Sequence, residues 1–164
     1  MSNLVAEATS FVHSYAALFA SPDASSPDHV GALCEKIGRH YRPGMTMFTN
    51  GQISRFDTQR DAAQLIEKEM RNNISTGLGT KLLLRSIDKI EPYSETSAIC
   101  WLKWTFEPME GSEFEGKGWT FVNVYGFRKE KEDEGEGKGG RGWEWVVRDQ
   151  EVDEVRRVTG GTFE

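Results

Sequence analysis

The sequence predicts an α+β domain in which three N-terminal helices pack on a strongly curved antiparallel sheet, forming a cone with an internal pocket. In the first half of the chain, apolar residues recur at three- and four-residue steps, as on amphipathic helices. From Lys81 onward the pattern is extended. All five tryptophans then fall between residues 101 and 145, in runs whose alternation is typical of strands.

Helices are expected over about residues 3–20, 28–40 and 57–77. Asp57 or Thr58 can cap the third helix through a side-chain oxygen, and glycines near residue 77 end it. Before that helix, Asn50-Gly51 is a strong hairpin-turn dipeptide because both residues tolerate positive φ. It should join two short strands.

The strands that follow are longer than the usual five or six residues, so the sheet must twist and curl. Alternation places five side chains of one run on a single face: Trp119, Phe121, Asn123, Tyr125 and Phe127. It gives the last run a shared face as well: Trp143, Trp145, Val147, Asp149 and Glu151. An aromatic wall with a few embedded polar groups is typical of a small-molecule pocket.

The 164 residues suit a single domain with its core over about 3–152. Residues 129–141 contain only charged residues and glycine, which predicts a mobile hairpin loop. Residues 155–164 are expected to form a tail.

The formal charge of -6 and the lack of a large basic cluster argue against nucleic acid or an anionic membrane as partner. The N-terminus does not resemble a secretory signal, and no apolar run reaches membrane-spanning length. Cys34 and Cys100 lie far apart without metal-ligand spacing, as in a reduced intracellular protein. We therefore expect a cytoplasmic protein whose partner is a small, largely neutral molecule.

The order and spacing of these elements resemble the SnoaL-like branch of the nuclear transport factor 2-like superfamily. The sharpest matches are Phe48-Thr-Asn-Gly51, Trp119-x-x-x-Asn-Val-Tyr-Gly126 and Trp143-Glu-Trp-x-x-x-Asp149. The resemblance implies a cystatin-like α+β barrel with a pocket at the wide end of a cone, and frequent dimerisation through the sheet. It also implies isomerases, dehydratases, cyclases or epoxide hydrolases that need no cofactor, or pure binding modules.

Asp149 is the first candidate for chemistry, because a carboxyl among apolar groups has its pKa raised and can exchange a proton near neutral pH. It could equally lie solvated at a strand end or pair with an arginine. Tyr125 and Asn123 could stabilise a developing oxyanion, or complete a structural hydrogen-bond network. Six residues are expected to bind substrate: Tyr41, Phe48, Trp104, Trp119, Phe121 and Trp145.

The three histidines are expected at the surface or at helix caps, and we expect no metal and no cofactor. Asp57, Arg60 and Asp61 sit at a helix start, where capping explains them better than the Asp-Arg-Asp constellation of limonene-epoxide-hydrolase-like proteins.

The sheet face opposite the aromatic wall should form a homodimer interface, since a contiguous apolar patch usually marks an association surface. Its residues are Ile99, Trp101, Val122, Val124 and Val146.

These features lead to two hypotheses. The first is a cofactor-independent acid/base enzyme of the isomerase, cyclase or dehydratase type, acting on a small hydrophobic substrate like the polyketides or terpenoids of secondary metabolism. The alternative is a non-catalytic small-ligand-binding or dimerisation module. Cavity volume should separate them, since a substrate site offers roughly 300 Å³ or more.

Overall fold

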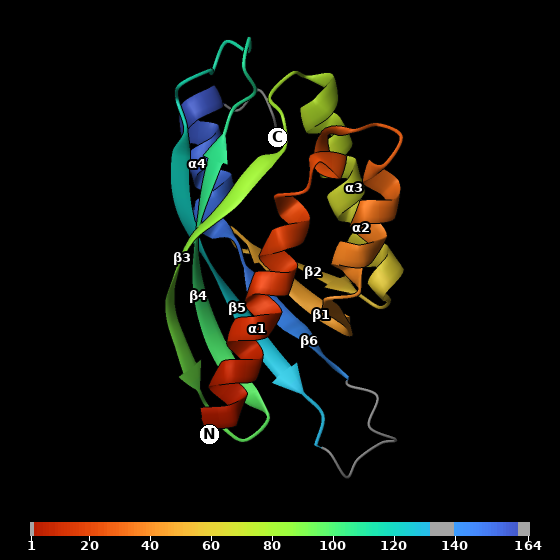
Figure 1. Ribbon diagram of the computed structural model, residues 1–164, viewed down its shortest axis with the longest axis vertical. Coiled ribbons are helices and arrows are strands. Elements are labelled where there is room, and N and C mark those ends of the chain that lie inside the picture. Colours follow the sequence, from red (N-terminus) through yellow and green to blue (C-terminus); the bar gives the residue numbers. More distant parts are fainter. Residues whose placement is uncertain (1, 132–139, 161–164) are drawn as a thin grey trace.

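The computed structural model describes residues 2–131 and 140–160, and its helices and strands follow the α+β order expected from the sequence (Figure 1). The elements are α1 (Ser2–Phe19), the 3-10 helix η1 (Pro22–Ser25), α2 (Val30–Gly38), β1 (Tyr41–Thr49), β2 (Gln52–Phe56), α3 (Gln59–Ser75), β3 (Lys81–Pro92), β4 (Ser97–Glu107), β5 (Trp119–Lys129), β6 (Arg141–Val147) and α4 (Asp149–Thr159). The expected helices over 3–20, 28–40 and 57–77 correspond to α1, α2 and α3.

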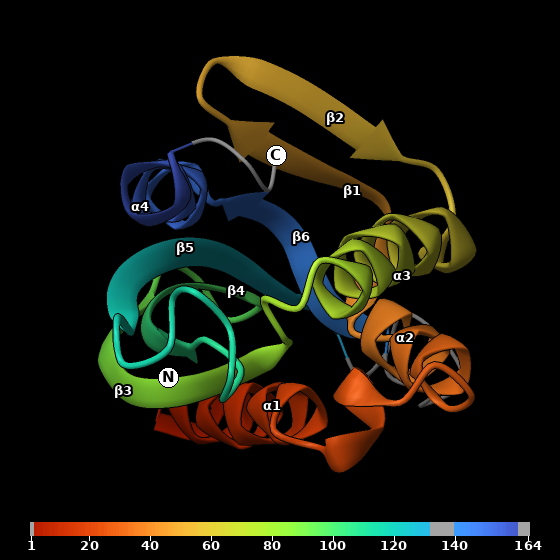
Figure 2. The same ribbon diagram turned by 90° about the horizontal axis from the view of Figure 1, so that it is seen from above.

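The six strands form one sheet in the order β2-β1-β6-β5-β4-β3. Its neighbours are antiparallel except β1 and β6, which run parallel, so the sheet is mixed rather than purely antiparallel. Strands β3 to β5 curl strongly, while α1, α2 and α3 lie along one side (Figure 2). The sheet stays open, because β2 and β3 are its two edges.

Local signals in the sequence set the ends of several elements. Thr58 caps α3 in a capping box: its Oγ1 accepts from the backbone N–H of Asp61, whose carboxylate accepts from the N–H of Thr58. The turn at Asn50 and Gly51 has φ of 48° and 83°, as the dipeptide predicts. Strand β1 begins at Tyr41, and an irregularity in its pairing between Tyr41 and Thr46 accommodates Pro43 and Gly44 within the strand.

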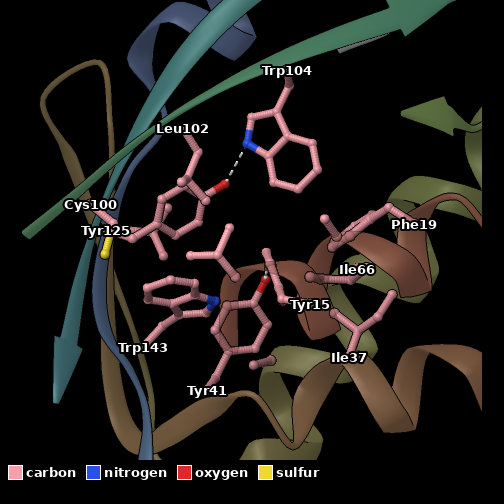
Figure 3. Packing of buried hydrophobic residues seen from close by; sticks show 14 of the residues in the cluster. Tyr15, Phe19, Ile37, Tyr41, Ile66, Cys100, Leu102, Trp104, Tyr125 and Trp143 are labelled. Carbon is pink, nitrogen blue, oxygen red and sulfur yellow. Dashed lines mark hydrogen bonds between the residues drawn. The ribbon is translucent and has the colours of Figure 1, made fainter. Parts of the chain in front are cut away.

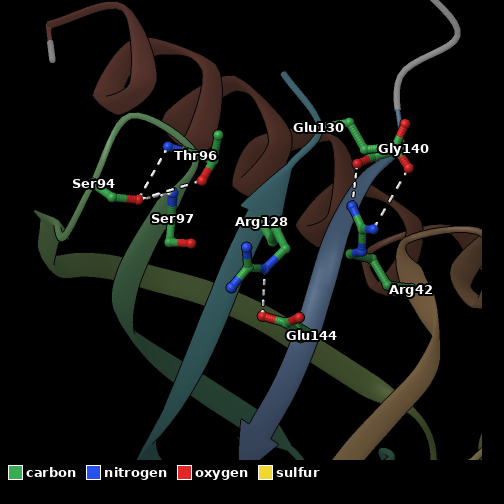
Figure 4. A network of polar contacts seen from close by, with 8 residues as sticks. All are labelled: Arg42, Ser94, Thr96, Ser97, Arg128, Glu130, Gly140 and Glu144. Carbon is green, nitrogen blue, oxygen red and sulfur yellow. Dashed lines mark hydrogen bonds and ion pairs between the residues drawn. The ribbon is translucent and has the colours of Figure 1, made fainter. Parts of the chain in front are cut away.

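A β-bulge in β6 reverses the face of the residues that follow it. Trp143 pairs with Phe127 and Trp145 pairs with Gly126, which leaves Glu144 without a partner residue. Trp143 and Val146 are therefore buried inside, whereas Trp145 lies over Gly126 on the outer face. Glu144 also faces outward, where its carboxylate accepts a hydrogen bond of 2.7 Å from Arg128 (Figure 4).

The bulge corrects part of the predicted dimer interface. Val146 lies inside the molecule and not on the outer face. The other four residues named for that interface are half-buried on the outer side of β4 and β5: Ile99, Trp101, Val122 and Val124. Dimerisation through this face stays a prediction.

Helix α4 replaces the strand end and part of the tail expected after Val147. It begins at Asp149 and ends at Thr159, with Gly160 in the left-handed conformation as its C-cap. The helix lies beside β5, where the Gln150 side chain accepts a hydrogen bond of 2.9 Å from the backbone N–H of Val122. The rest of the predicted tail, 161–164, lies outside the described residues.

The predicted charged loop is described only at its two ends, since 132–139 lie outside the described residues. Arg42 of β1 holds these ends together: it pairs with Glu130 at 3.6 Å and donates to the carbonyl oxygen of Gly140 (Figure 4). Within residues 2–131 and 140–160, no helix has the length and apolar character needed to cross a bilayer.

Candidate functional site

A cavity of about 110 Å³ lies between the inner face of the sheet and helices α1, α3 and α4. Strands supply most of its apolar wall and helices most of its charged groups. Its lining comprises Tyr15, Phe19, Tyr41, Met47, Ile66, Glu69, Met70, Asn73, Thr80, Leu82, Trp104, Phe106, Asn123, Tyr125, Val146, Arg148 and Glu151.

A larger hollow, of about 520 Å³, lies near η1 and the segment after β4. Its charged side chains are exposed or half-buried, and Lys81 already pairs with Glu107 at 2.6 Å. Solvated ion pairs of this kind contribute little to recognition. The smaller cavity is the better candidate site because it brings buried titratable groups together.

Tyr125 is the central hydrogen-bonding group of the cavity wall. Its hydroxyl oxygen accepts a hydrogen bond of 3.0 Å from Trp104 Nε1 (Figure 3). It accepts another, of 3.4 Å, from Asn123 Nδ2. Since both neighbours donate, the Tyr125 hydroxyl hydrogen remains available as a donor. Burial first, and then the charge of Glu151, raise the pKa of Tyr125 well above its ordinary value, so the hydroxyl stays protonated.

Glu151, in the first turn of α4, places a carboxyl against this wall. Its Oε2 accepts a hydrogen bond of 3.3 Å from Asn123 Nδ2, and the carboxyl is buried although the residue keeps some exposed surface. Burial raises the pKa of Glu151, Glu69 raises it further, and Arg148 and Asn123 act in the opposite direction. A carboxyl with a raised pKa keeps its proton to a higher pH than an exposed glutamate does, and it can both take up and return a proton.

Arg148 provides the positive charge of the cavity. Its guanidinium makes a two-pronged ion pair with Glu69 of α3, at 2.8 and 3.1 Å, and its Nε donates to Thr49 Oγ1 at 3.1 Å. Burial opposes the charge of Arg148, but Glu69 outweighs it and the pKa of Arg148 is raised overall. The arginine therefore stays charged inside the protein.

A second pair of hydroxyls lies on the side of α1. The Tyr15 and Tyr41 hydroxyls are hydrogen-bonded at 2.5 Å (Figure 3). Burial raises the pKa of both phenols. This pair extends the cavity wall with neutral polar groups.

The structure places only some of the predicted site residues on the cavity. Four line it: Tyr41, Trp104, Asn123 and Tyr125. Phe48 does not, because alternation along β1 turns Met45 and Met47 inward instead. Trp145 is on the outer face beyond the bulge.

The other two predicted aromatics are buried in packed regions. Trp119 stacks on Phe106 with ring centroids 4.7 Å apart, and Phe121 is buried away from the cavity. Their side chains contribute to the core and do not line the cavity.

The structure places Asp149 outside this cavity. This residue begins α4, and its carboxylate accepts a hydrogen bond of 2.7 Å from the backbone N–H of Asn50, outside the cavity. The strand face on which the prediction rested does not extend past Val147, because the chain turns into a helix. Glu151, two residues further on, occupies the buried position.

Sequence reasoning missed Arg148, Glu151 and Glu69. The segment after Val147 carried a helical signal: acidic residues open it, Arg156 and Arg157 close it, and Gly160 follows. Residues three apart on a helix lie on the same side, so that signal would have placed Arg148 near Glu151. Nothing local in the sequence indicates that Glu69 of α3 meets Arg148.

The histidines take no part in the cavity. His13 and His29 are exposed, and His40 packs against Phe11 and Tyr15, where burial lowers its pKa. Over residues 2–131 and 140–160, no group of three or more His, Cys, Asp and Glu side chains could hold a metal ion.

Neither a family model nor a curated protein matches this chain. Solved structures match its fold. An NTF2-like protein of unknown function from Shewanella oneidensis MR-1 has a TM-score of 0.58 at 10% identity, over 87% of this chain and 96% of that protein. A ketosteroid isomerase-like protein from Erwinia carotovora atroseptica has a TM-score of 0.56 at 8% identity, over 85% and 89%.

A third similar structure is a domain of unknown function with a cystatin-like fold from Nostoc punctiforme. Its TM-score is 0.56 at 12% identity, over 92% of this chain and 89% of that domain. The protein therefore has the nuclear transport factor 2-like fold, an α+β architecture of the cystatin-like type.

Proposed function

We propose that this protein is a cofactor-independent acid/base enzyme that moves a proton next to a carbonyl group, as isomerases do. The observation that carries the proposal is the buried Glu151 carboxyl, which shares a cavity with the free hydroxyl donor of Tyr125. Asn123 links the two groups, because its amide donates to both of them. A positioned acid or base and a positioned donor are the two parts that such chemistry requires.

In the proposed reaction, the Glu151 carboxylate accepts a proton from a carbon beside the substrate carbonyl. The electron pair of the broken C–H bond moves toward the carbonyl oxygen, and an enolate forms. The Tyr125 hydroxyl donates a hydrogen bond to that oxygen as its negative charge grows. In a substrate whose C=C bond is conjugated with the enolate, the Glu151 carboxyl then returns the proton to the far carbon of that bond. The C=C bond moves next to the carbonyl, the carboxylate is restored and the isomerisation is complete.

The size of the cavity narrows the substrate. Its volume of about 110 Å³ is well below the roughly 300 Å³ of a site for a drug-sized molecule. An engineered protein cavity of about 150 Å³ binds benzene. The proposal therefore favours a substrate of about that size or smaller over the polyketide- or terpenoid-like molecules suggested by the aromatic wall.

The small volume also favours the alternative, a binding module without turnover. In that case the same polar groups would orient a small ligand, and Glu151 would move no proton. The two functions differ only in catalysis, so the test must measure a reaction.

The experiment follows exchange of the α-protons of 2-butanone for deuterium by NMR in D₂O. The wild-type protein should accelerate exchange over buffer, and Glu151→Gln should lower the accelerated rate by about 100-fold or more. Asp149→Asn is the matched control: it changes a carboxyl of the same helix turn that faces Asn50, and should leave the rate unchanged. No acceleration by the wild type would reject catalysis and leave the binding module.

A further inference from the structure

We propose that the ligand of this cavity is a small organic carboxylate, a 2-oxo or 2-hydroxy acid, whose carboxylate binds Arg148 in place of Glu69. This inference rests on the proposed function, since it assigns a substrate class to the same cavity. In the absence of ligand, the Glu69 carboxylate occupies the position beside the Arg148 guanidinium where the ligand carboxylate would bind.

Arg148 has the properties of a built anion site. Its side chain is only 17% exposed and lines the cavity, and the bond from Nε to Thr49 fixes its orientation. The two Nη atoms face a single carboxylate in the forked geometry that arginine uses to recognise carboxylates. A buried guanidinium without such a partner would be strongly destabilising, so the position must always hold an anion.

Glu69 is suited to leave that position. Its side chain is 43% exposed, so its carboxylate can rotate away from Arg148 into water. Hydration there replaces the contact with the guanidinium. Arg148 cannot follow, because it is covered and bound to Thr49. An arriving carboxylate would restore the same charge balance around the guanidinium that Glu69 provides now.

The opposite wall of the cavity indicates what else the ligand carries. Asn123 is only 4% exposed, and its Oδ1 is buried without a hydrogen-bond partner among the described residues. Such an acceptor requires a donor, which the hydroxyl of a hydroxy acid or an enol would supply. Tyr125 offers a donor for a carbonyl oxygen. A carboxylate next to a carbonyl or hydroxyl carbon matches these groups within about 110 Å³.

The test compares 2-oxobutyrate with 2-butanone, which has a methyl group where the acid has its carboxylate. Binding is followed by ¹H–¹⁵N NMR at the Trp104 indole N–H, which is hydrogen-bonded to Tyr125 in the cavity. The wild type should bind 2-oxobutyrate at least about tenfold more tightly than 2-butanone, the effect expected of a charged hydrogen bond. Arg148→Lys should lose about tenfold or more of that affinity, because lysine lacks the fork.

Glu69→Gln should act in the opposite direction and bind 2-oxobutyrate roughly two- to fivefold more tightly, since a half-exposed competitor loses its charge. Glu67→Gln is its matched control: Glu67 pairs with Arg71 at 3.0 Å on the same helix, outside the cavity, and should change nothing. Tighter binding by Glu69→Gln also supports the proposal if Arg148→Lys proves poorly folded.

Two outcomes overturn the inference: equal affinity of the wild type for the acid and the ketone, or no tightening in Glu69→Gln. Either would leave α-proton exchange of 2-butanone as an independent test of Glu151. Conversely, Arg148-dependent binding of 2-oxobutyrate without any exchange catalysis would reject the proposed enzyme and keep carboxylate recognition.

Discussion

Two regions of the inner sheet face differ in what the helices place against them. Near the Trp143 end of β6, α1 contributes Phe11. The centroid of its ring lies 4.9 Å from that of Trp143 and 5.2 Å from that of Phe127, so aromatic rings fill the space. Near Tyr125, α4 contributes Glu151 instead, and a cavity remains. The same strands serve both regions, so the helix opposite them decides whether a region is core or site.

The two regions should therefore differ in their contribution to stability. The packed region buries aromatic surface at close contact, which stabilises the fold. The cavity holds the covered guanidinium of Arg148, paired with a half-exposed Glu69, and an amide oxygen without a partner among the described residues. Such groups cost stability and are usually retained for function. Substitutions in the packed region should lower stability, and those in the cavity should lower activity.

The largest effect is expected for Trp143→Ala in the packed region. Trp143 is fully buried, so its removal should lower the free energy of unfolding by about 3–5 kcal/mol. Trp101→Ala on the outer face is the control and should cost about 1 kcal/mol or less, because that side chain is only partly buried. Urea denaturation measures both, and similar losses would contradict the distinction between the two faces.

Tyr125→Phe in the cavity should have the reverse profile. Loss of the hydroxyl donor should lower the rate of 2-butanone exchange by about 100-fold. Its effect on unfolding should be much smaller than that of Trp143→Ala. Tyr93→Phe removes a hydroxyl from a side chain that is 81% exposed, and should leave the rate unchanged. A wild-type rate in Tyr125→Phe would remove the donor from the mechanism.

A smaller effect concerns stability and pH. Since the pKa of Glu151 is raised above its ordinary 4.5, the folded protein holds this proton more tightly than the unfolded chain. The stability it contributes is present below that value and is lost as pH rises through the folded pKa. As the pH rises above 4.5, the free energy of unfolding should therefore fall less for Glu151→Gln than for the wild type. At neutral pH the variant should be the more stable of the two. Urea denaturation at several pH values measures this, and the same pH dependence of the free energy of unfolding in both proteins would contradict it.

Much of the fold could be predicted because its signals are local. The apolar stripe of α1, the Asn50-Gly51 turn and the alternation along β5 each depend on neighbouring residues. The bulge at Glu144 could not be predicted in this way, since it depends on the register between β6 and β5. It moved Trp145 and Val146 to the faces opposite to those expected.

The site was predicted only in part for the same reason. Strand alternation correctly placed Asn123 and Tyr125 together on the inner face. It failed at Asp149, because the strand pattern was continued into a helix. The pairing of Arg148 with Glu69 joins residues far apart in the sequence, and only the tertiary structure brings them together.

The central claim is that Glu151 presents a buried, proton-exchanging carboxyl to the cavity. A ¹³C NMR titration of the glutamate side-chain carboxyls tests it directly, with the Glu151 resonance identified by its loss in Glu151→Gln. The midpoint for Glu151 should lie above the ordinary glutamate value of 4.5. A midpoint at or below that value would show a solvated or fully ion-paired carboxylate and would contradict the account.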